Sequence, residues 1–75
     1  MEAKQFGQFI AGIRKEKKMT QAELAEKINV TDKAVSRWER GLGFPDIQTL
    51  EPLAQALGIS VLELMRSKKK ESTGD

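Results

Sequence analysis

The chain has 75 residues, enough for one small domain, and its net charge at pH 7 is only +2. It contains neither cysteine nor histidine, which excludes disulfide bonds, thiolate chemistry, and the commonest general base and transition-metal ligand. No stretch approaches the roughly 20 consecutive apolar residues of a membrane span, and the start of the chain lacks the apolar core of a secretory leader. We therefore expect a cytoplasmic domain that is not an enzyme and that needs no cofactor or metal.

The charges are unevenly distributed along the chain. Residues 1–40 contain nine Lys and Arg against six acids, whereas residues 41–65 contain three acids and no Lys or Arg. A polyanionic partner would therefore meet the first half of the chain, together with the basic tail around Lys68. The alternative is that scattered lysines only keep a small domain soluble, and charge alone does not separate the two interpretations.

The first predicted helix covers about residues 3–17. Its inner positions recur at the i, i+3, i+4 and i+7 spacing of a core-facing helical stripe. These positions are Phe6, Phe9, Ile10, Ile13 and Lys17.

A second, short helix is predicted after Thr20. The sequence from Thr20 to Glu23 fits a capping box, in which the Thr hydroxyl and the Glu carboxylate satisfy backbone N–H groups reciprocally. The helix ends near Asn29, because asparagine tolerates the left-handed conformation that a sharp turn requires. Val30 then fills the turn with an apolar side chain.

A third helix is predicted between Thr31 and about Arg40. Thr31 is an N-cap candidate, and Asp32 is well placed for the positive end of the helix. Gly41 is a natural C-terminal stop for this helix.

Two further helices complete the predicted all-α domain, which spans residues 1–66. Asp46 can cap a fourth helix that ends at Gly58, with Pro52 either bending it or marking where its regular part begins. Ser60 to Glu63 form a second capping box that opens a fifth helix through about residue 65. Residues 67–75 are expected to be a disordered basic tail or linker.

The segment from Thr20 to Gly41 has the pattern of a helix-turn-helix, in which the second helix of the pair can enter a DNA major groove. The motif requires a small residue where its helices cross, a left-handed turn, and an apolar residue facing back from the second helix. Ala25, Asn29 and Val35 satisfy these requirements in register.

The run TQAELAEKINVTDKAVSRWERGLGFPDIQTL resembles the Xre-type helix-turn-helix family, which includes the DNA-binding domains of the phage Cro and repressor proteins. The resemblance extends from about Phe6 to Leu64. It implies a compact five-helix, lambda-repressor-like domain that binds operator DNA and regulates transcription, in the cytoplasm or nucleoid of a bacterial or phage system.

The exposed face of the third helix is expected to read bases. Its members are Asp32, Lys33, Ser36 and Arg37. Lys or Arg can bond guanine O6 and N7, and Asp can accept from cytosine N4. Asp32 has an alternative role at the helix N-terminus, and Arg37 has an alternative ion pair with Glu26 or Glu39.

A second group is expected to bind phosphates, which positions a domain without specifying sequence. By the family pattern, Gln21 bonds a phosphate at the start of the second helix and can also brace the third helix. The remaining members are Thr31, Arg40, the backbone around Gly43, and Lys18, which adds unspecific attraction.

Arg14 and Glu39 match family positions that form a largely buried salt bridge between the first and third helices. The resemblance assigns this pair to structure and orientation. Trp38 follows Val35 by three residues, so we expect it to pack in the core rather than to stack on a base.

Three classes of function compete. A transcriptional regulator, in our expectation a repressor, is favoured by the basic third helix. An antitoxin or other protein-interaction module is the alternative, and an enzyme has no support in the sequence.

One small domain contacts too few base pairs for selectivity, so we expect a homodimer on half-sites roughly 34–36 Å apart. Leu62 and Met65 are candidates for the dimer contact, and the chain can equally be one module of a longer protein.

Overall fold

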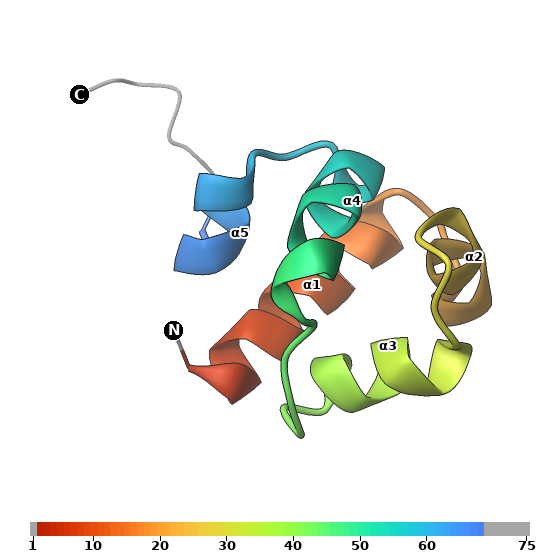
Figure 1. Cartoon of the computed structure of the whole chain (residues 1–75), viewed down its shortest axis with the longest axis horizontal. Helices are drawn as coiled ribbons and strands as arrows, with labels where there is room; N and C mark the ends of the chain where they lie inside the picture. Colours follow the sequence, from red (N-terminus) through yellow and green to blue (C-terminus); the bar gives the residue numbers. More distant parts are fainter. Residues whose placement is uncertain (1, 69–75) are drawn as a thin grey trace.

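The computed structural model describes residues 2–68 and contains five α-helices in that range, with no strand. Figure 1 shows α5 at one end of the molecule and α2 at the other, with α1 and α4 between them. The helices are α1 (Ala3–Glu16), α2 (Gln21–Lys27), α3 (Asp32–Glu39), α4 (Ile47–Leu57) and α5 (Val61–Arg66). The predicted five-helix all-α fold is confirmed, and the predicted tail lies outside the described residues from residue 69 onward.

Local capping explains where the short helices begin. The Thr20 hydroxyl accepts from the backbone N–H of Glu23 at 3.0 Å, and the Glu23 carboxylate accepts from the backbone N–H of Thr20 at 2.8 Å. Ser60 and Glu63 form the same reciprocal pair at the start of α5. Asp46 caps α4 by accepting from the backbone N–H of Thr49. These three predicted caps are confirmed.

Left-handed residues explain where the helices stop. Asn29 has a φ of 60°, as predicted for the turn between α2 and α3, and Gly41 and Gly58 have φ values of 77° and 73° after α3 and α4. Lys18 also has a positive φ, 59°, in the turn between α1 and α2. The sequence gives no signal for this conformation, because lysine has no special tolerance for it.

Pro52 lies within α4, whose regular part begins at Ile47 rather than at the proline. The prediction that Pro52 marks the start of the regular helix is therefore wrong. Its side chain is exposed, so the ring faces solvent instead of the core. The missing N–H removes one helical hydrogen bond, to the carbonyl of Gln48, and the Asp46 cap fixes the first turn independently of it.

The core is built around α1, which contacts α3, α4 and α5, while α2 packs mainly on α3. The fully buried large side chains are Phe6, Ile10, Leu24, Val35, Leu53, Leu57 and Leu64. The predicted inner stripe of α1 is confirmed for its apolar members except Phe9, which is half-buried, and it stops before Lys17, which is exposed. The Lys17 ammonium instead lies near Gly58, at the C-terminal end of α4, where a positive charge is favourable.

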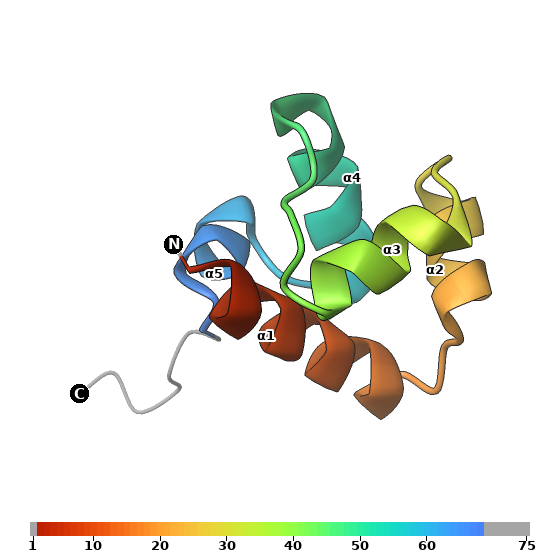
Figure 2. The same cartoon turned by 90° about the horizontal axis from the view of Figure 1, so that it is seen from below.

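The N-terminal half of α1 approaches the C-terminal end of α3 very closely (Figure 2). A Cβ atom on Gly7 would stand 2.2 Å from the carbonyl oxygen of Trp38, and one on Gly41 would stand 2.9 Å from the Cα of Lys4. Only glycine allows the two backbones to lie at this separation. This packing sets the position of α3, which carries the candidate functional face.

Candidate nucleic-acid interface

One side of α3 faces the core and the other faces solvent. Val35 is fully buried and Trp38 is 7% exposed, which confirms the predicted core position of the tryptophan. The opposite side carries the four residues predicted to read bases, of which Ser36 is half-buried and the others are exposed. These residues are Asp32, Lys33, Ser36 and Arg37. The structure therefore brings the whole predicted reading group onto one accessible face.

Arg37 leans toward the loop that follows α3. Its Nη2 atom donates to the carbonyl oxygen of Leu42 at 3.4 Å, and the position of a Cβ on Gly43 lies 3.7 Å from the same nitrogen. This contact is long and exposed, so it restrains the guanidinium only weakly. Glu39, one of the two predicted alternative partners of Arg37, is bonded instead to Arg14 and Gln21.

The two ends of the α3 face have different chemistry. Thr31 caps α3 by accepting from the backbone N–H of Ala34 at 3.1 Å, which leaves its hydroxyl proton available to donate outward. Asp32 occupies the first turn of α3, where its charge favours the helix N-terminus. At the other end, Arg40 donates to the carbonyl oxygen of Ser36 at 3.4 Å and remains exposed.

A buried ion pair connects α1 to α3. Arg14 Nε donates to Glu39 Oε2 at 2.6 Å and Arg14 Nη2 donates to Glu39 Oε1 at 2.9 Å, a bidentate arrangement. The two side chains are 10% and 7% exposed, so the predicted buried salt bridge is present. The hydrogen bond to Glu39 raises the pKa of Arg14 above its ordinary value, because it outweighs the opposing effect of burial.

The ion pair also reaches α2. Gln21 Nε2 donates to Glu39 Oε1 at 2.9 Å, and Arg14 Nη1 donates to the carbonyl oxygen of Met19 at 2.7 Å. Glu39 thus joins three helices, and Arg14 fixes the turn that precedes α2. The bracing of α3 by Gln21 is part of the predicted arrangement, whereas the choice of Glu39 as its partner is not visible in the sequence.

Residues 10–64 match the helix-turn-helix family. The chain belongs to this family. The match covers α2, α3 and α4 completely and includes the Arg14–Glu39 pair, so the family assignment rests on the part of the chain that builds the candidate interface.

Known helix-turn-helix proteins resemble this chain in sequence and in fold. The immunity repressor protein of Bacillus phage phi105 is 49% identical over 55 residues, which cover 73% of this chain and 38% of the repressor. The structure superimposes on the P22 c2 repressor protein in complex with synthetic operator 9T, with a TM-score of 0.80 and 33% identity, covering 84% of this chain and 96% of the other. The fold is therefore that of a phage repressor domain.

The same fold also occurs as one part of larger proteins. The hydroxypropylphosphonic acid epoxidase from S. wedmorenis matches with a TM-score of 0.75 and 30% identity, covering 84% of this chain but only 34% of that enzyme. The first three curated relatives are likewise longer, because the chain spans 32 to 38% of their length. A helix-turn-helix domain of this kind is thus compatible with several protein contexts.

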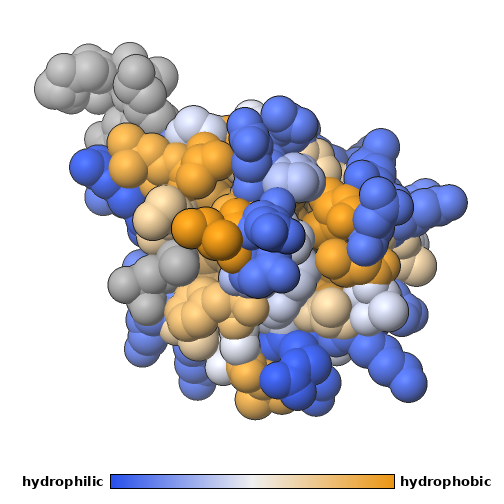
Figure 3. Space-filling view, in the orientation of Figure 1, coloured by the Kyte–Doolittle hydropathy of each residue, from blue (hydrophilic) through white to orange (hydrophobic). Residues whose placement is uncertain are grey.

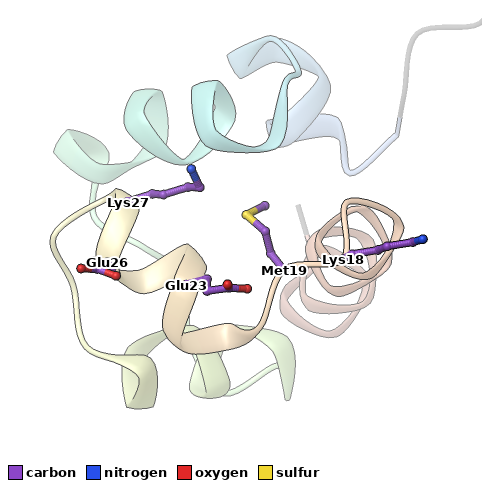
Figure 4. Close-up of a pocket in the computed structure, with 5 residues that line it drawn as sticks. All are labelled: Lys18, Met19, Glu23, Glu26 and Lys27. Atoms are coloured by element: carbon purple, nitrogen blue, oxygen red, sulfur yellow. The ribbon is translucent and has the colours of Figure 1, made fainter.

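Lys18, one of the residues predicted to bind phosphate, lies in the turn between α1 and α2. It helps to line a hollow of about 450 Å³ together with Met19, Glu23, Glu26 and Lys27 (Figure 4). Glu23 is two residues after Gln21 and therefore lies on nearly the opposite side of α2. The proposed contact of Lys18 with a phosphate stays a prediction. No residue pattern in the sequence predicts this hollow, whose walls come from the turn after α1 and from one face of α2.

Exposed apolar residues gather in two places. Figure 3 shows hydrophobic side chains over α5, where Leu62 is 58% exposed and Met65 is 46% exposed. The second place is the loop after α3 and the start of α4, where Leu42, Phe44 and Ile47 are exposed. Phe44 also packs on buried Phe6, with ring centroids 5.3 Å apart, so the loop is held against α1.

No helix in the part of the chain that the structure describes is both long enough and apolar enough to cross a membrane. Among residues 2–68, no three acidic side chains come together in a way that could hold a metal ion.

Proposed function

We propose that this domain is a sequence-specific DNA-binding transcriptional regulator, acting as a repressor, that places α3 in the major groove. The observation that carries the proposal is the accessible face of α3, where two cations and one acid surround Ser36 while the opposite face is buried. The fold of the P22 c2 repressor protein, known in complex with an operator, supports the same role. Binding, rather than catalysis, is the proposed activity.

Base contacts are proposed for the middle of the α3 face. Lys33 and Arg37 are exposed cations suited to guanine O6 and N7, and Ser36 can donate or accept. Asp32 can accept from cytosine N4, a role that its place in the first turn of α3 does not prevent because its side chain is exposed.

Phosphate contacts are proposed at the edges of this face. The Thr31 hydroxyl has a free proton, Gln21 stands at the N-terminus of α2, and Arg40 is exposed at the end of α3. The backbone of Gly43 and the side chain of Lys18 complete the proposed group. These contacts would set the orientation of the domain while the central residues read sequence.

We further propose that the domain acts as a homodimer. A single α3 face meets only a few base pairs, whereas two copies on half-sites roughly 34–36 Å apart read a full operator. The exposed Leu62 and Met65 on α5 are the proposed contact, and α5 lies away from α3 in Figure 1. A dimer made through α5 therefore leaves both reading faces accessible. The expected location is the cytoplasm.

Selection of bound sequences from a random duplex pool tests the proposal. A recurring motif with two-fold symmetry is the expected result, and enrichment of no motif at low salt and high protein concentration would reject sequence-specific binding. In that case the protein-interaction module becomes the better interpretation. The matched control is Lys27→Ala, which removes an exposed cation from α2 outside the proposed contacts and should leave the selected motif unchanged.

A further inference from the structure

Glu39 is bonded to a residue in each of two other helices. Its Oε2 atom accepts from Arg14 Nε, and its Oε1 atom accepts from both Arg14 Nη2 and Gln21 Nε2, the last two at 2.9 Å. A carboxylate beside an arginine is ionised and can only accept hydrogen bonds. The side chain of Gln21 must therefore present its NH₂ group to Glu39.

The orientation of the Gln21 amide follows from this contact. If the amide were flipped, its oxygen would face the Glu39 carboxylate oxygen, which is repulsive. In the observed orientation one N–H of Nε2 is bonded to Glu39, and the second N–H remains for another acceptor. Gln21 is only half-buried and is the first residue of α2, so this second donor is accessible at a helix N-terminus.

We propose that Glu39 is a positioning residue for DNA binding, which orients the Gln21 amide so that its second N–H donates to a phosphate oxygen. The proposal rests on the proposed DNA-binding function. Arg14 acts through Glu39, because its bidentate contact fixes the carboxylate and its bond to the Met19 carbonyl fixes the turn before α2. Without the carboxylate, the amide is free to turn its oxygen toward the phosphate.

The direction in which Glu39→Gln changes DNA affinity distinguishes positioning from simple electrostatics. Glu39→Gln removes a negative charge and would strengthen binding to DNA if charge alone mattered. We expect it to weaken binding about threefold or more, because the introduced amide has one acceptor oxygen where the carboxylate has two, and it cannot hold both Arg14 and the amide of Gln21 as the carboxylate does. Glu26→Gln removes the same charge from an exposed site and should leave affinity unchanged or slightly higher. Equal effects of the two variants would overturn the proposal.

A double-mutant cycle separates positioning from general damage to the fold. Gln21→Ala alone should weaken binding about tenfold, as expected for loss of a hydrogen bond to a charged group. In the Gln21→Ala background, Glu39→Gln should then change affinity less than twofold, because its effect passes through the missing amide. Fully additive effects, measured on variants that circular dichroism shows to be folded, would mean that Glu39 acts independently of Gln21.

A spectroscopic test needs no destabilised variant. In ¹⁵N-labelled wild-type protein, the two side-chain amide protons of Gln21 are identified by their loss in Gln21→Ala. When a duplex of about 20 base pairs is added at low salt, the proton that is not bonded to Glu39 should move downfield while its partner stays. If backbone amides of α3 shift but that proton does not, the inference is wrong and DNA binding survives. If no amide of α2 or α3 shifts, the proposed function fails first.

Discussion

A methyl group on Gly7 would stand 2.2 Å from the carbonyl oxygen of Trp38, so the backbones of α1 and α3 meet with no room for a side chain. Arg14 follows Gly7 by seven residues, nearly two helical turns, and lies on the same side of α1. There it holds Glu39, the neighbour of Trp38, through two hydrogen bonds. Helix α1 therefore fixes the C-terminal end of α3 in two ways: Gly7 packs against the backbone of Trp38, and Arg14 forms an ion pair with Glu39.

Gly7→Ala should destabilise the domain by about 1–3 kcal/mol, because the added methyl group meets backbone atoms that cannot rotate away. Urea denaturation measures the change in the free energy of unfolding. Gly12→Ala in the same helix is the matched control, since a Cβ there has no neighbour within 4 Å. That substitution should stabilise the domain by about 0.5–1 kcal/mol through improved helix propensity.

Arg14→Met should lower the free energy of unfolding by about 3–5 kcal/mol, because Glu39 is left buried without its cation. Combining it with Glu39→Leu should recover a large part of this loss, since the double variant buries no unpaired charge. Thermal and urea unfolding of both single variants and the double variant supply the comparison. A double variant that is as unstable as the sum of the two single variants would contradict the interpretation.

Asn29→Val should destabilise the domain by about 1–2 kcal/mol, because a β-branched residue is strained at the observed φ of 60°. Asn29→Gly is the matched control and should be neutral or slightly stabilising, as glycine adopts this conformation without strain. The side chain is exposed, so neither substitution removes core packing. Similar losses in both variants would indicate a side-chain role for Asn29 instead.

Arg37→Ala should relax the preference at one operator position by about 1–3 kcal/mol while leaving the rest of the motif unchanged. The residue is exposed and bonded only weakly to the Leu42 carbonyl, so stability should remain within about 0.5 kcal/mol. Affinities for the selected operator and for its single-base variants give the answer. A uniform loss on all sequences would assign Arg37 to a phosphate rather than a base.

Leu62→Asp should convert the proposed dimer to a monomer in sedimentation experiments without unfolding it, because the side chain is 58% exposed. Ile47→Asp provides the comparison, since this residue is 83% exposed on a different helix and should leave the dimer intact. A wild-type protein that is monomeric with and without operator would remove the dimer proposal altogether.

Helix positions could be predicted because their signals are local. The hydroxyl of Thr20 and the carboxylate of Glu23 are three residues apart, and their reciprocal bonds need no other part of the chain. Asn29 likewise signals its turn through its own conformational tolerance. The face of α3 follows from helical periodicity once Thr31 fixes where the helix begins.

Contacts between distant segments could not be predicted in the same way. Gly7 and Gly12 look alike in the sequence, as two unfavourable glycines within one helix, yet only Gly7 touches α3. The bond from Gln21 to Glu39 joins residues 18 positions apart and depends on how α2 crosses α3. The family resemblance supplied the Arg14–Glu39 pair, which composition and spacing alone do not reveal.

The two faces of α3 have a consequence for how such a domain can change its target. Val35 and Trp38, which hold the helix in place, are buried, while Lys33 and Arg37 project into solvent from the other side. Exchanging the solvent-facing residues therefore costs little folding energy. Substitutions on the exposed face can therefore change which operator the domain prefers, while the buried residues that hold the helix stay the same.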